Sequence, residues 1–477
     1  MIKLLLLATT LTLTLFALET TPEKKITKLE DDALFHANRE SGLSIYEAMQ
    51  KAIEQSPKLH AASEVVVQEK EKVAEAEAGH LPAINLSGDT GYEARQTTED
   101  PSVESPSAVT SQYRYKKTDL YLTISENLWA GGSIENSIDE KEAYLKASLF
   151  DYRDQLETLV LDVATAYYNV VYSEIALKIA LKNMKNYEKI LKIVTIKEKN
   201  GAATTGDVNF IRANVDNAKT ELAQKEKDVI DAISMYVYLL QTEQKEEMPY
   251  EISSPLYIAD LNTTLSDADK YNAKLLRQRA YIKGTKFGFL ATKGNFHPSV
   301  DLAINGESRN EFDIGPGGQR EKVNALVTFN YNLYNGGKDE ATAIRLLAKM
   351  KEQKFLYKDI ERNIVFDLKV LNSSVTSLSQ SLKLTENEVL AARKVVDSYW
   401  VAFQHGTQDL QALQLAQRNL NSAEQNYAKY KKDLILNNFA LMKKTGALLK
   451  FLELPYKQNA AEFKGDLNLF YEFSNLE

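Results

Sequence analysis

The sequence of 477 residues contains no cysteine, and this absence excludes several kinds of site. Disulfides, thiolate metal sites, a cysteine nucleophile and a lipid-modified N-terminal cysteine are all ruled out. The five histidines, at positions 36, 60, 80, 297 and 405, are scattered, and none has the spacing of metal ligands. The net charge is −8, and no basic stripe is present, which argues against nucleic acid as a partner.

Motifs of catalysis and nucleotide binding are also lacking. Gly201 and Gly206 have the spacing of a phosphate-binding loop, but Asp207 stands where the lysine should be, and the segment follows a helical pattern. No Gly-x-Ser-x-Gly elbow is present either. We therefore expect a protein that is not an enzyme and that has no catalytic, cofactor-binding or metal-binding residues.

Long apolar runs are missing except at the N-terminus. Lys3 is followed by an apolar run from Leu4 to Phe16, which is shorter than the ~20 residues of a membrane-spanning helix. This pattern predicts a signal peptide over residues 1–18, followed by an N-terminal segment over 19–42, and hence an exported protein. A buried helix or a single membrane anchor is the alternative interpretation of the run.

What the sequence does contain is a long internal repeat. Glu126-Asn-Leu-Trp-Ala-Gly-Gly132 recurs as Tyr331-Asn-Leu-Tyr-Asn-Gly-Gly337, an offset of 205 that holds without a gap for roughly a hundred residues. Upstream, His80-Leu-Pro82 and Phe296-His-Pro298 match at an offset of 216. The chain therefore holds two copies of one structural unit. We assign them to residues 43–242 and 265–452, with a linker over 243–264 and a C-terminal tail over 453–477.

After each Gly-Gly pair the pattern is helical and long. Apolar residues follow one another in alternating steps of four and three from Leu145 to Val194 and, 205 residues later, from Met350 to Tyr399. No proline interrupts either stretch, and this spacing predicts a coiled coil about 100 Å long. Each helix ends at a glycine, and a second helix returns after tips at about 200–207 and 405–409. Each copy therefore contains a coiled-coil helical hairpin.

Before each Gly-Gly pair the apolar period changes to two. The alternation predicts strands at about 84–95 and 113–129 in the first copy, and at about 300–309 and 322–334 in the second. Each hairpin has an apolar and a polar face, which fits either a two-faced sheet of a soluble protein or a membrane β-barrel. Four strands cannot close a barrel, and open edges are not tolerated in lipid. Three chains would supply 12 strands, which is the simplest closed solution.

These motifs together resemble the TolC family of outer-membrane efflux proteins. The resemblance covers residues 43–452 and includes the Gly-Gly turns, the tip from Gly201 to Val208 and the opening segment from Leu43 to Ala52. It implies a mainly α fold with membrane β: a homotrimer with a 12-strand β-barrel in the outer membrane on an α-helical barrel in the periplasm. It also implies an exit duct of a tripartite efflux or type I secretion system. The implied partners are a periplasmic adaptor protein, an inner-membrane pump or ABC exporter, and outer-membrane lipid.

The resemblance also points to candidate functional residues. Acidic residues that narrow the pore in related proteins align here with Ala412 and Leu415, so Asp409 or an apolar ring is expected to replace them. The candidates for the hairpin tips and adaptor contact are Gly201, Asp207, Val208, Gly406 and Leu413. The candidates for the pore constriction are Asp409, Leu413 and Leu415. The expected strand-to-helix turns are Gly131, Gly132, Gly336 and Gly337, and the expected membrane-edge aromatics are Tyr121, Trp129, Tyr331 and Tyr334.

Three alternatives stay open at this point. The aromatic residues also suit ordinary sheet packing. The whole chain also fits an exported coiled-coil structural or adhesin protein, or the periplasmic adaptor subunit itself.

Overall fold

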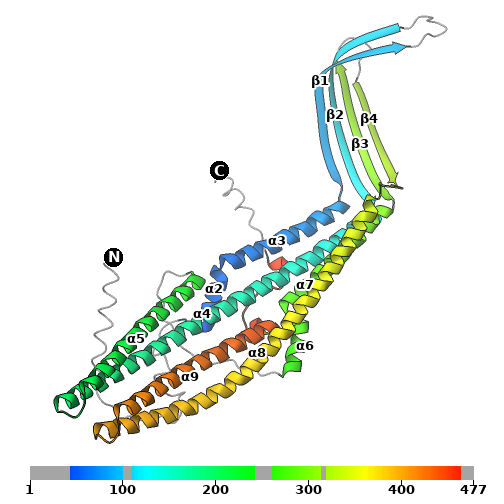
Figure 1. Ribbon diagram of the computed structural model, residues 1–477. Helices are drawn as coiled ribbons and strands as arrows, with labels where there is room; N and C mark the ends of the chain where they lie inside the picture. The colour runs from blue at the N-terminus through cyan, green and yellow to red at the C-terminus, as the bar shows by residue number, and fades with distance from the viewer. Residues whose placement is uncertain (1–42, 100–108, 242–259, 313–318, 464–477) are drawn as a thin grey trace. The chain divides into compact units, whose positions relative to one another are not determined.

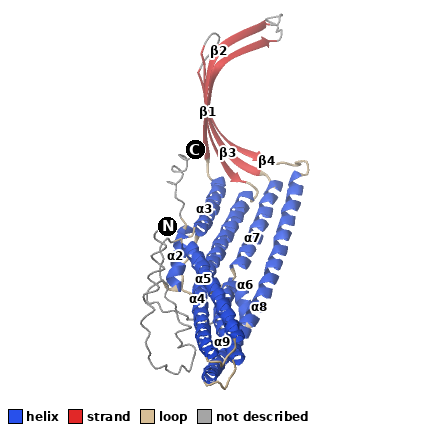
Figure 2. Ribbon diagram, turned by 60° about the vertical axis from the view of Figure 1, so that its left-hand side comes forward, coloured by secondary structure: helices blue, strands red, loops and turns tan. Residues whose placement is uncertain are grey.

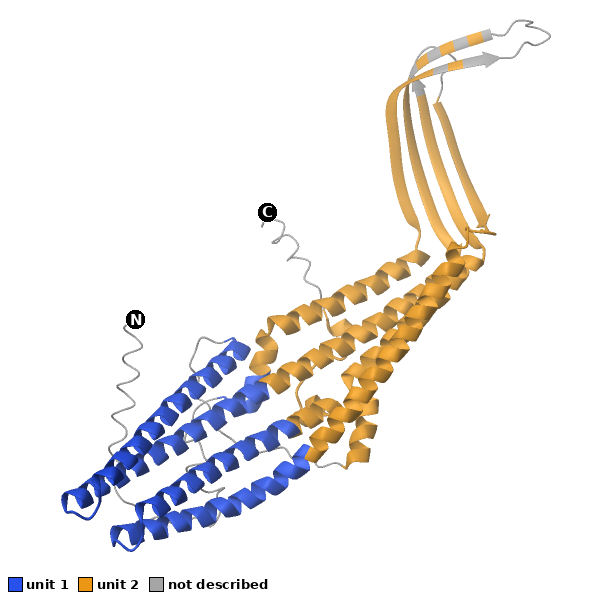
Figure 3. Ribbon diagram, in the orientation of Figure 1, with its two compact units in different colours: residues 1–49, 163–256, 374–437 blue, residues 50–162, 257–373, 438–477 orange. Residues whose placement is uncertain are grey.

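The structure is a computed structural model that describes residues 43–99, 109–241, 260–312 and 319–463. The predicted signal peptide, the segment 19–42 and the end of the C-terminal tail lie outside the described residues. The chain forms two compact units (Figure 3). Unit 1 comprises Met1–Met49, Val163–Leu256 and Ser374–Asn437, and unit 2 comprises the remaining residues. Each unit contains segments of both predicted repeats, so the units are not the repeats themselves.

The elements follow one another in the same order in both halves of the chain (Figures 1 and 2). The first half contains α2 (Ile45–Gln55), α3 (Pro57–Glu77), η3 (Ala78–His80), β1 (Ala83–Glu99), β2 (Val109–Trp129), α4 (Ser133–Lys199) and α5 (Thr205–Leu240). The second half contains α6 (Leu261–Tyr271), α7 (Ala273–Lys293), η4 (Gly294–Phe296), β3 (Ser299–Phe312), β4 (Gln319–Asn330), α8 (Lys338–Gln404), α9 (Leu410–Thr445), α10 (Leu448–Phe451) and η5 (Ala460–Glu462).

The two sequence offsets are reproduced by the element ends. The starts and ends of α2, α3 and η3 match those of α6, α7 and η4 at an offset of 216, and those of α4 and α5 match α8 and α9 at 205. The predicted duplication is therefore confirmed in the structure. Helix α6 begins at Leu261, inside the range 243–264 that the sequence assigned to a linker. The four helices before the strands were not predicted. Helices α2 and α6 have only 11 residues each, and α3 and α7 lack the long seam of alternating steps that revealed α4 and α8.

The long helices pack along the predicted apolar seam. Every seam residue between Leu145 and Val194 is buried or half-buried. In unit 1, helices α4, α5, α8 and α9 share one core, whose buried members are Tyr187, Ile190, Val194, Val208, Ile211, Val215, Ala218, Phe403, Leu410 and Leu413. In unit 2, a second core joins α6, α7, α8 and α9 through Ala268, Leu275, Ile364, Leu368 and Leu441. Within the described residues, none of the helices is both long and apolar enough to cross a membrane.

The four strands of unit 2 form one antiparallel sheet in the order β1-β2-β3-β4 (Figure 1). Strands β1 and β4 are its edges. Strand β2 continues to Trp129 because β3 pairs with its last residues. Strand β4 ends at Asn330 instead of the predicted 334, so Tyr331 and Tyr334 lie beyond the strand.

The strand register separates an apolar face from a polar face. One row across the sheet reads Ile84, Ile124, Ile304 and Ala325, and the adjacent row on the opposite face reads Asn85, Thr123, Asn305 and Asn324. A side chain changes face at every residue of a strand, so this register keeps each kind of side chain together. The apolar face is exposed; its exposed members include Ile84, Leu86, Leu120, Leu122, Ile304, Val323, Val327 and Phe329.

Candidate functional site

The polar face of the sheet carries a chain of hydrogen bonds that crosses three strands. The Thr123 hydroxyl on β2 donates to Asn305 Oδ1 on β3 (3.2 Å), and Asn305 Nδ2 donates to Asn324 Oδ1 on β4 (3.0 Å). Nearer to the strand-to-helix turn, Asn127 Nδ2 donates to Asp301 Oδ1 (2.7 Å). These side chains make this face of the sheet hydrophilic, and most of them are uncharged.

Asp119 is the centre of a charged cluster on the same face. Its carboxylate accepts hydrogen bonds from Lys117 Nζ (2.9 Å) and from the Tyr121 hydroxyl (2.8 Å), and Arg309 Nε lies 3.4 Å away. The Asp119 side chain has no exposed surface in the single chain. Tyr121 therefore belongs to the polar face, which corrects its expected place among the membrane-edge aromatics. The alternation of Leu120 and Leu122 with Tyr121 already contained this information.

The other expected membrane-edge aromatics lie near the turns. Past a β-bulge after Asn127, Trp129 pairs with Val300 on the apolar face, and its ring lies 6.4 Å from the ring of His297. Tyr331 and Tyr334 are exposed in the segment that follows β4. Their place at a membrane edge stays a prediction.

Both strand-to-helix turns use a pair of glycines in the left-handed region. Gly131 and Gly132 have φ of 63° and 80°, and Gly336 and Gly337 have φ of 59° and 79°. A Cβ on Gly131 would also lie 2.6 Å from His297 Cβ, so no larger residue fits there. A side chain would strain this backbone conformation, so glycine suits all four positions.

The first hairpin tip is fixed by two caps. Gly201, with φ of 73°, follows the end of α4, and the Ala202 N–H donates to the Lys197 carbonyl (2.7 Å). Thr204 and Asp207 then form a capping box at the start of α5, in which each side chain accepts the other's backbone N–H. The backbone N–H of Thr204 holds the pKa of Asp207 below its usual value. Asp207 thus has a structural role at the tip.

The second tip repeats the arrangement, with one cap at the end of α8 and one at the start of α9. Gly406 has φ of 77°, and the Thr407 N–H donates to the Ala402 carbonyl (2.9 Å). Asp409 precedes α9, and its Oδ1 accepts from the Ala412 N–H (2.6 Å). The carboxylate expected at the pore constriction is therefore the N-terminal cap of α9, and Asp409 is exposed.

Sequence comparison decides the family. The family described as outer membrane efflux protein matches residues 48–234 and 264–447, which together make up more than half of the chain. The chain belongs to this family. It is accordingly an outer-membrane efflux protein. Membership of this family supports neither the adhesin nor the adaptor alternative.

Individual relatives of the efflux protein are distant but span most of its length. It is 21% identical over 409 residues to outer membrane protein TolC of Vibrio cholerae serotype O1, covering 79% of this chain and 85% of that one. It is 22% identical over 400 residues to the pyoverdine export outer membrane protein OpmQ of Pseudomonas aeruginosa, with 79% of each chain covered. The crystal structure of CusC has the same fold, with a TM-score of 0.74 and 15% identity over 90% of this chain and 98% of that one.

The predicted tip residues of the efflux protein differ in accessibility. Leu413 is 1% exposed and Val208 is also buried, and both belong to the core of unit 1, so neither offers a surface to a partner or to a pore within the chain. Leu415, by contrast, is 52% exposed. Burial corrects the expected surface roles of Leu413 and Val208, whereas the role of Leu415 stays a prediction.

Leu415 belongs to a set of exposed apolar residues near the tips, and the other three members were missed in the sequence. Each of the four helices of unit 1 presents one such side chain close to its tip, and the first two match the last two at the offset of 205. These tip apolar residues are Ile196, Phe210, Val401 and Leu415. Their coincidence in both repeats was visible in the sequence, but their exposure was not.

Two buried carboxylates lie among the helices. In unit 1, Glu424 of α9 accepts hydrogen bonds from Lys182 of α4 (2.9 Å) and Arg393 of α8 (2.8 Å). In unit 2, Glu157 pairs with Arg153 (2.9 Å), but burial raises the pKa of Glu157 to about 7.

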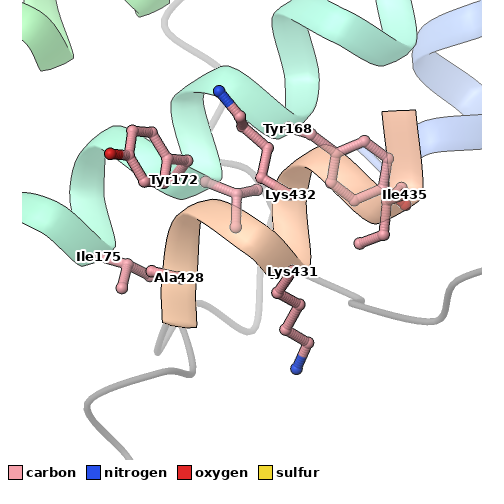
Figure 4. A pocket seen from close by; sticks show the side chains of 8 residues that line it. Tyr168, Tyr172, Ile175, Ala428, Lys431, Lys432 and Ile435 are labelled. Carbon is pink, nitrogen blue, oxygen red and sulfur yellow. The ribbon is translucent and has the colours of Figure 1, made fainter. Parts of the chain in front are cut away.

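A groove in unit 1 runs between α4 and α9 (Figure 4). Lys432 lies over it, with Nζ 4.6 Å from the centre of the Tyr172 ring, whereas Lys431 points away. The groove walls are apolar helix surfaces, and within the described residues it holds no group of metal ligands. We interpret this groove as a gap between two packed helices and not as a binding site.

Proposed function

We propose that three copies of this efflux protein close their sheets into one 12-stranded barrel, with the apolar face toward outer-membrane lipid and the polar face around the export path. The observation that carries this proposal is the sheet of four strands, which has one exposed apolar face and two open edges. Open edges are not tolerated in a bilayer, so strands of further copies must cover them.

The edge helix α8 supports association between copies. In unit 2, its exposed side chains Ile344, Phe355 and Phe366 are spaced 11 residues apart, which places them on one side of the helix. An exposed apolar stripe of this length in an exported protein is typical of an interface. The same copies that close the sheet would cover it.

The proposed duct would open at the hairpin tips to a periplasmic adaptor, which couples it to an inner-membrane pump or to the ABC exporter of a type I secretion system. The tip apolar residues Ile196, Phe210, Val401 and Leu415 are the surface that we assign to adaptor contact, framed by Gly201 and Gly406. Asp207 contributes by holding the first tip in shape. We keep Asp409 as the candidate for the constriction, because Leu415 is assigned here to adaptor contact.

Heat-modifiable migration tests the trimeric barrel. The protein should fractionate with the outer membrane and migrate as a trimer in detergent gels until it is boiled. A water-soluble monomer that does not enter bilayers would contradict the proposal.

Site-directed crosslinking tests the adaptor contact. Single cysteines at Phe210 and Leu415 should crosslink to the adaptor in cells. A cysteine at Gln112, which is exposed on β2, serves as the control and should not. Crosslinks from position 112 alone would show that the adaptor binds elsewhere.

A further inference from the structure

The internal repeat shows how the two open edges of the sheet pair with each other. Resting on the proposed trimer, we propose that β4 of one subunit pairs with β1 of the next in the register of the internal β2–β3 seam. This register sets Asn324 opposite Glu93 and Tyr331 opposite Leu86. Residues 331–334, which follow β4 in the single chain, join the strand upon assembly.

The repeat conserves strand register as well as sequence. Ala83 pairs with Ser125 in the first hairpin; adding 216 to 83 and 205 to 125 gives Ser299 and Asn330, which are paired in the second. The β2–β3 seam joins the second strand of one copy to the first strand of the next. Its counterpart between subunits is the seam between β4 and β1.

The internal seam then defines the partners across subunits. Asp119 pairs with Arg309. Adding 205 to 119 gives Asn324, and subtracting 216 from 309 gives Glu93. The same conversion of the pair Thr123–Asn305 gives Thr328 and Asp89.

The two faces of the sheet continue across the seam in this register. It places Phe329 opposite Gly88 and Tyr331 opposite Leu86, so that the apolar face of β4 continues into the apolar face of β1. A slip by one residue would set the apolar face of one subunit beside the polar face of the next. The repeat preserves the face of each side chain, so the derived register keeps both faces continuous from one subunit to the next.

The polar side chains at the seam are also chemically matched. Inside the chain, the Thr123 hydroxyl donates to Asn305 (3.2 Å), and Asp119 lies 3.4 Å from Arg309. Between subunits, the Thr328 hydroxyl can donate to the Asp89 carboxylate. The Asn324 amide can likewise donate to the Glu93 carboxylate.

Cations flank Glu93 in this register. Lys322, exposed on β4, lies diagonal to it, and Lys117 Nζ on β2 of the same chain lies 3.9 Å from the Glu93 carboxylate. The Glu93 carboxylate thus lies between two positive charges at the seam.

The different lengths of β2 and β4 have the same origin. Strand β1 pairs with β2 only as far as Ser125, and β2 continues to Trp129 because β3 lies on its other side. Strand β4 ends at Asn330, the counterpart of Ser125, where β3 stops pairing with it. In the proposed seam, Asn332 faces Asn85 and Tyr334 faces Ile84, next to the start of β1 at Ala83.

Disulfide crosslinking tests the register, because the chain has no cysteine of its own. Two matched double variants are Glu93→Cys with Asn324→Cys, and Asp89→Cys with Thr328→Cys. Within one chain the two positions of each pair lie on opposite edges of the sheet, about 14 Å apart across the strands and about 26 Å apart along them, so only different subunits can be joined. Oxidation of outer membranes should convert both variants into covalent trimers.

The control variant, Asp89→Cys with Asn324→Cys, is four residues out of register, or about 13 Å. It should remain monomeric in boiled gels after oxidation. Covalent trimers from the control, or from neither matched pair while heat-modifiable trimers persist, would overturn the register and leave the trimeric duct intact. Loss of heat-modifiable trimers in the unsubstituted protein would overturn both proposals.

Discussion

At the scale of single residues, two buried carboxylates affect how the helices respond to pH and to substitution. Glu157 is almost fully buried with one partner, Arg153, whereas Glu424 has two cationic partners on two other helices. Burial penalises a charged carboxylate, and partners offset the penalty. The two residues therefore differ in how they respond to pH and to substitution.

Glu157 should make stability fall as pH rises. Its pKa of about 7 exceeds the ordinary 4.5, so the folded protein retains a proton that the unfolded chain loses between pH 4.5 and 7. The contribution of Glu157 to stability is then greatest below pH 4.5 and declines through pH 7, by at most about 3 kcal/mol. Glu157→Gln should remove this decline in thermal denaturation of the purified protein. Glu188→Gln, an exposed carboxyl on the same helix, is the control and should keep it.

Glu424→Ala should destabilise unit 1. It leaves Lys182 and Arg393 without their shared anion, at a cost of about 3 kcal/mol. Faster hydrogen exchange in α4, α8 and α9 would show this loss. Asp231→Ala breaks an exposed pair with Lys227 and should cost no more than about 0.5 kcal/mol. Similar losses for both variants would contradict the assigned role of Glu424.

Residue types were easier to predict from the sequence than residue environments. The Gly-Gly turns were found because positive φ demands glycine and both copies carry the pair. Tyr121 was placed on the wrong face because its aromatic character outweighed the alternation around it. Leu413 was taken for a surface residue because the packing of four helices around the tip is not encoded in any local pattern.

At the scale of elements, the caps of the hairpin tips combine structure with a candidate function. Asp409 both caps α9 and carries a charge on an exposed tip. The two roles can be separated, because asparagine caps a helix about as well as aspartate but is neutral.

Asp409→Asn and Asp409→Ala should distinguish the cap from the gate. If the charge narrows the pore, both variants should lose cation selectivity in single-channel recordings. Only Asp409→Ala should also loosen the tip, by about 1 kcal/mol. Unchanged conductance, leak and selectivity in both variants would exclude Asp409 as the gate.

The elements that the sequence predicted well are the regular ones. Helices α4 and α8 were predicted from an apolar period that is sustained over many turns. Strand β4 was predicted too long because the sequence pattern of 331–334 repeats that of β2, whereas a strand also requires a neighbour on its edge. Pairing partners in another subunit are not visible in local alternation.

At the scale of the whole molecule, the sheet must present opposite faces to lipid and water. Leu122 and Thr123 are adjacent on β2 and lie on opposite faces. Substitutions at these two positions therefore test which face of the sheet contacts lipid and which contacts water.

Leu122→Lys should impair insertion, because a lysine facing lipid costs about 2–4 kcal/mol near the bilayer midplane. Thr123→Lys should insert normally and reduce cation conductance, since the new charges would line the path. Outer-membrane yield and planar-bilayer recordings measure the two effects. Equal yields of both variants would contradict the proposed orientation of the sheet.

The exposed apolar face of the sheet has a consequence for biogenesis. Before the other subunits bind, each newly exported chain exposes a broad apolar surface and two unpaired strand edges. This combination promotes aggregation. We therefore expect each chain to need a holdase chaperone during transit to the membrane. Depleting this chaperone should produce insoluble chains rather than chains delivered to the wrong place.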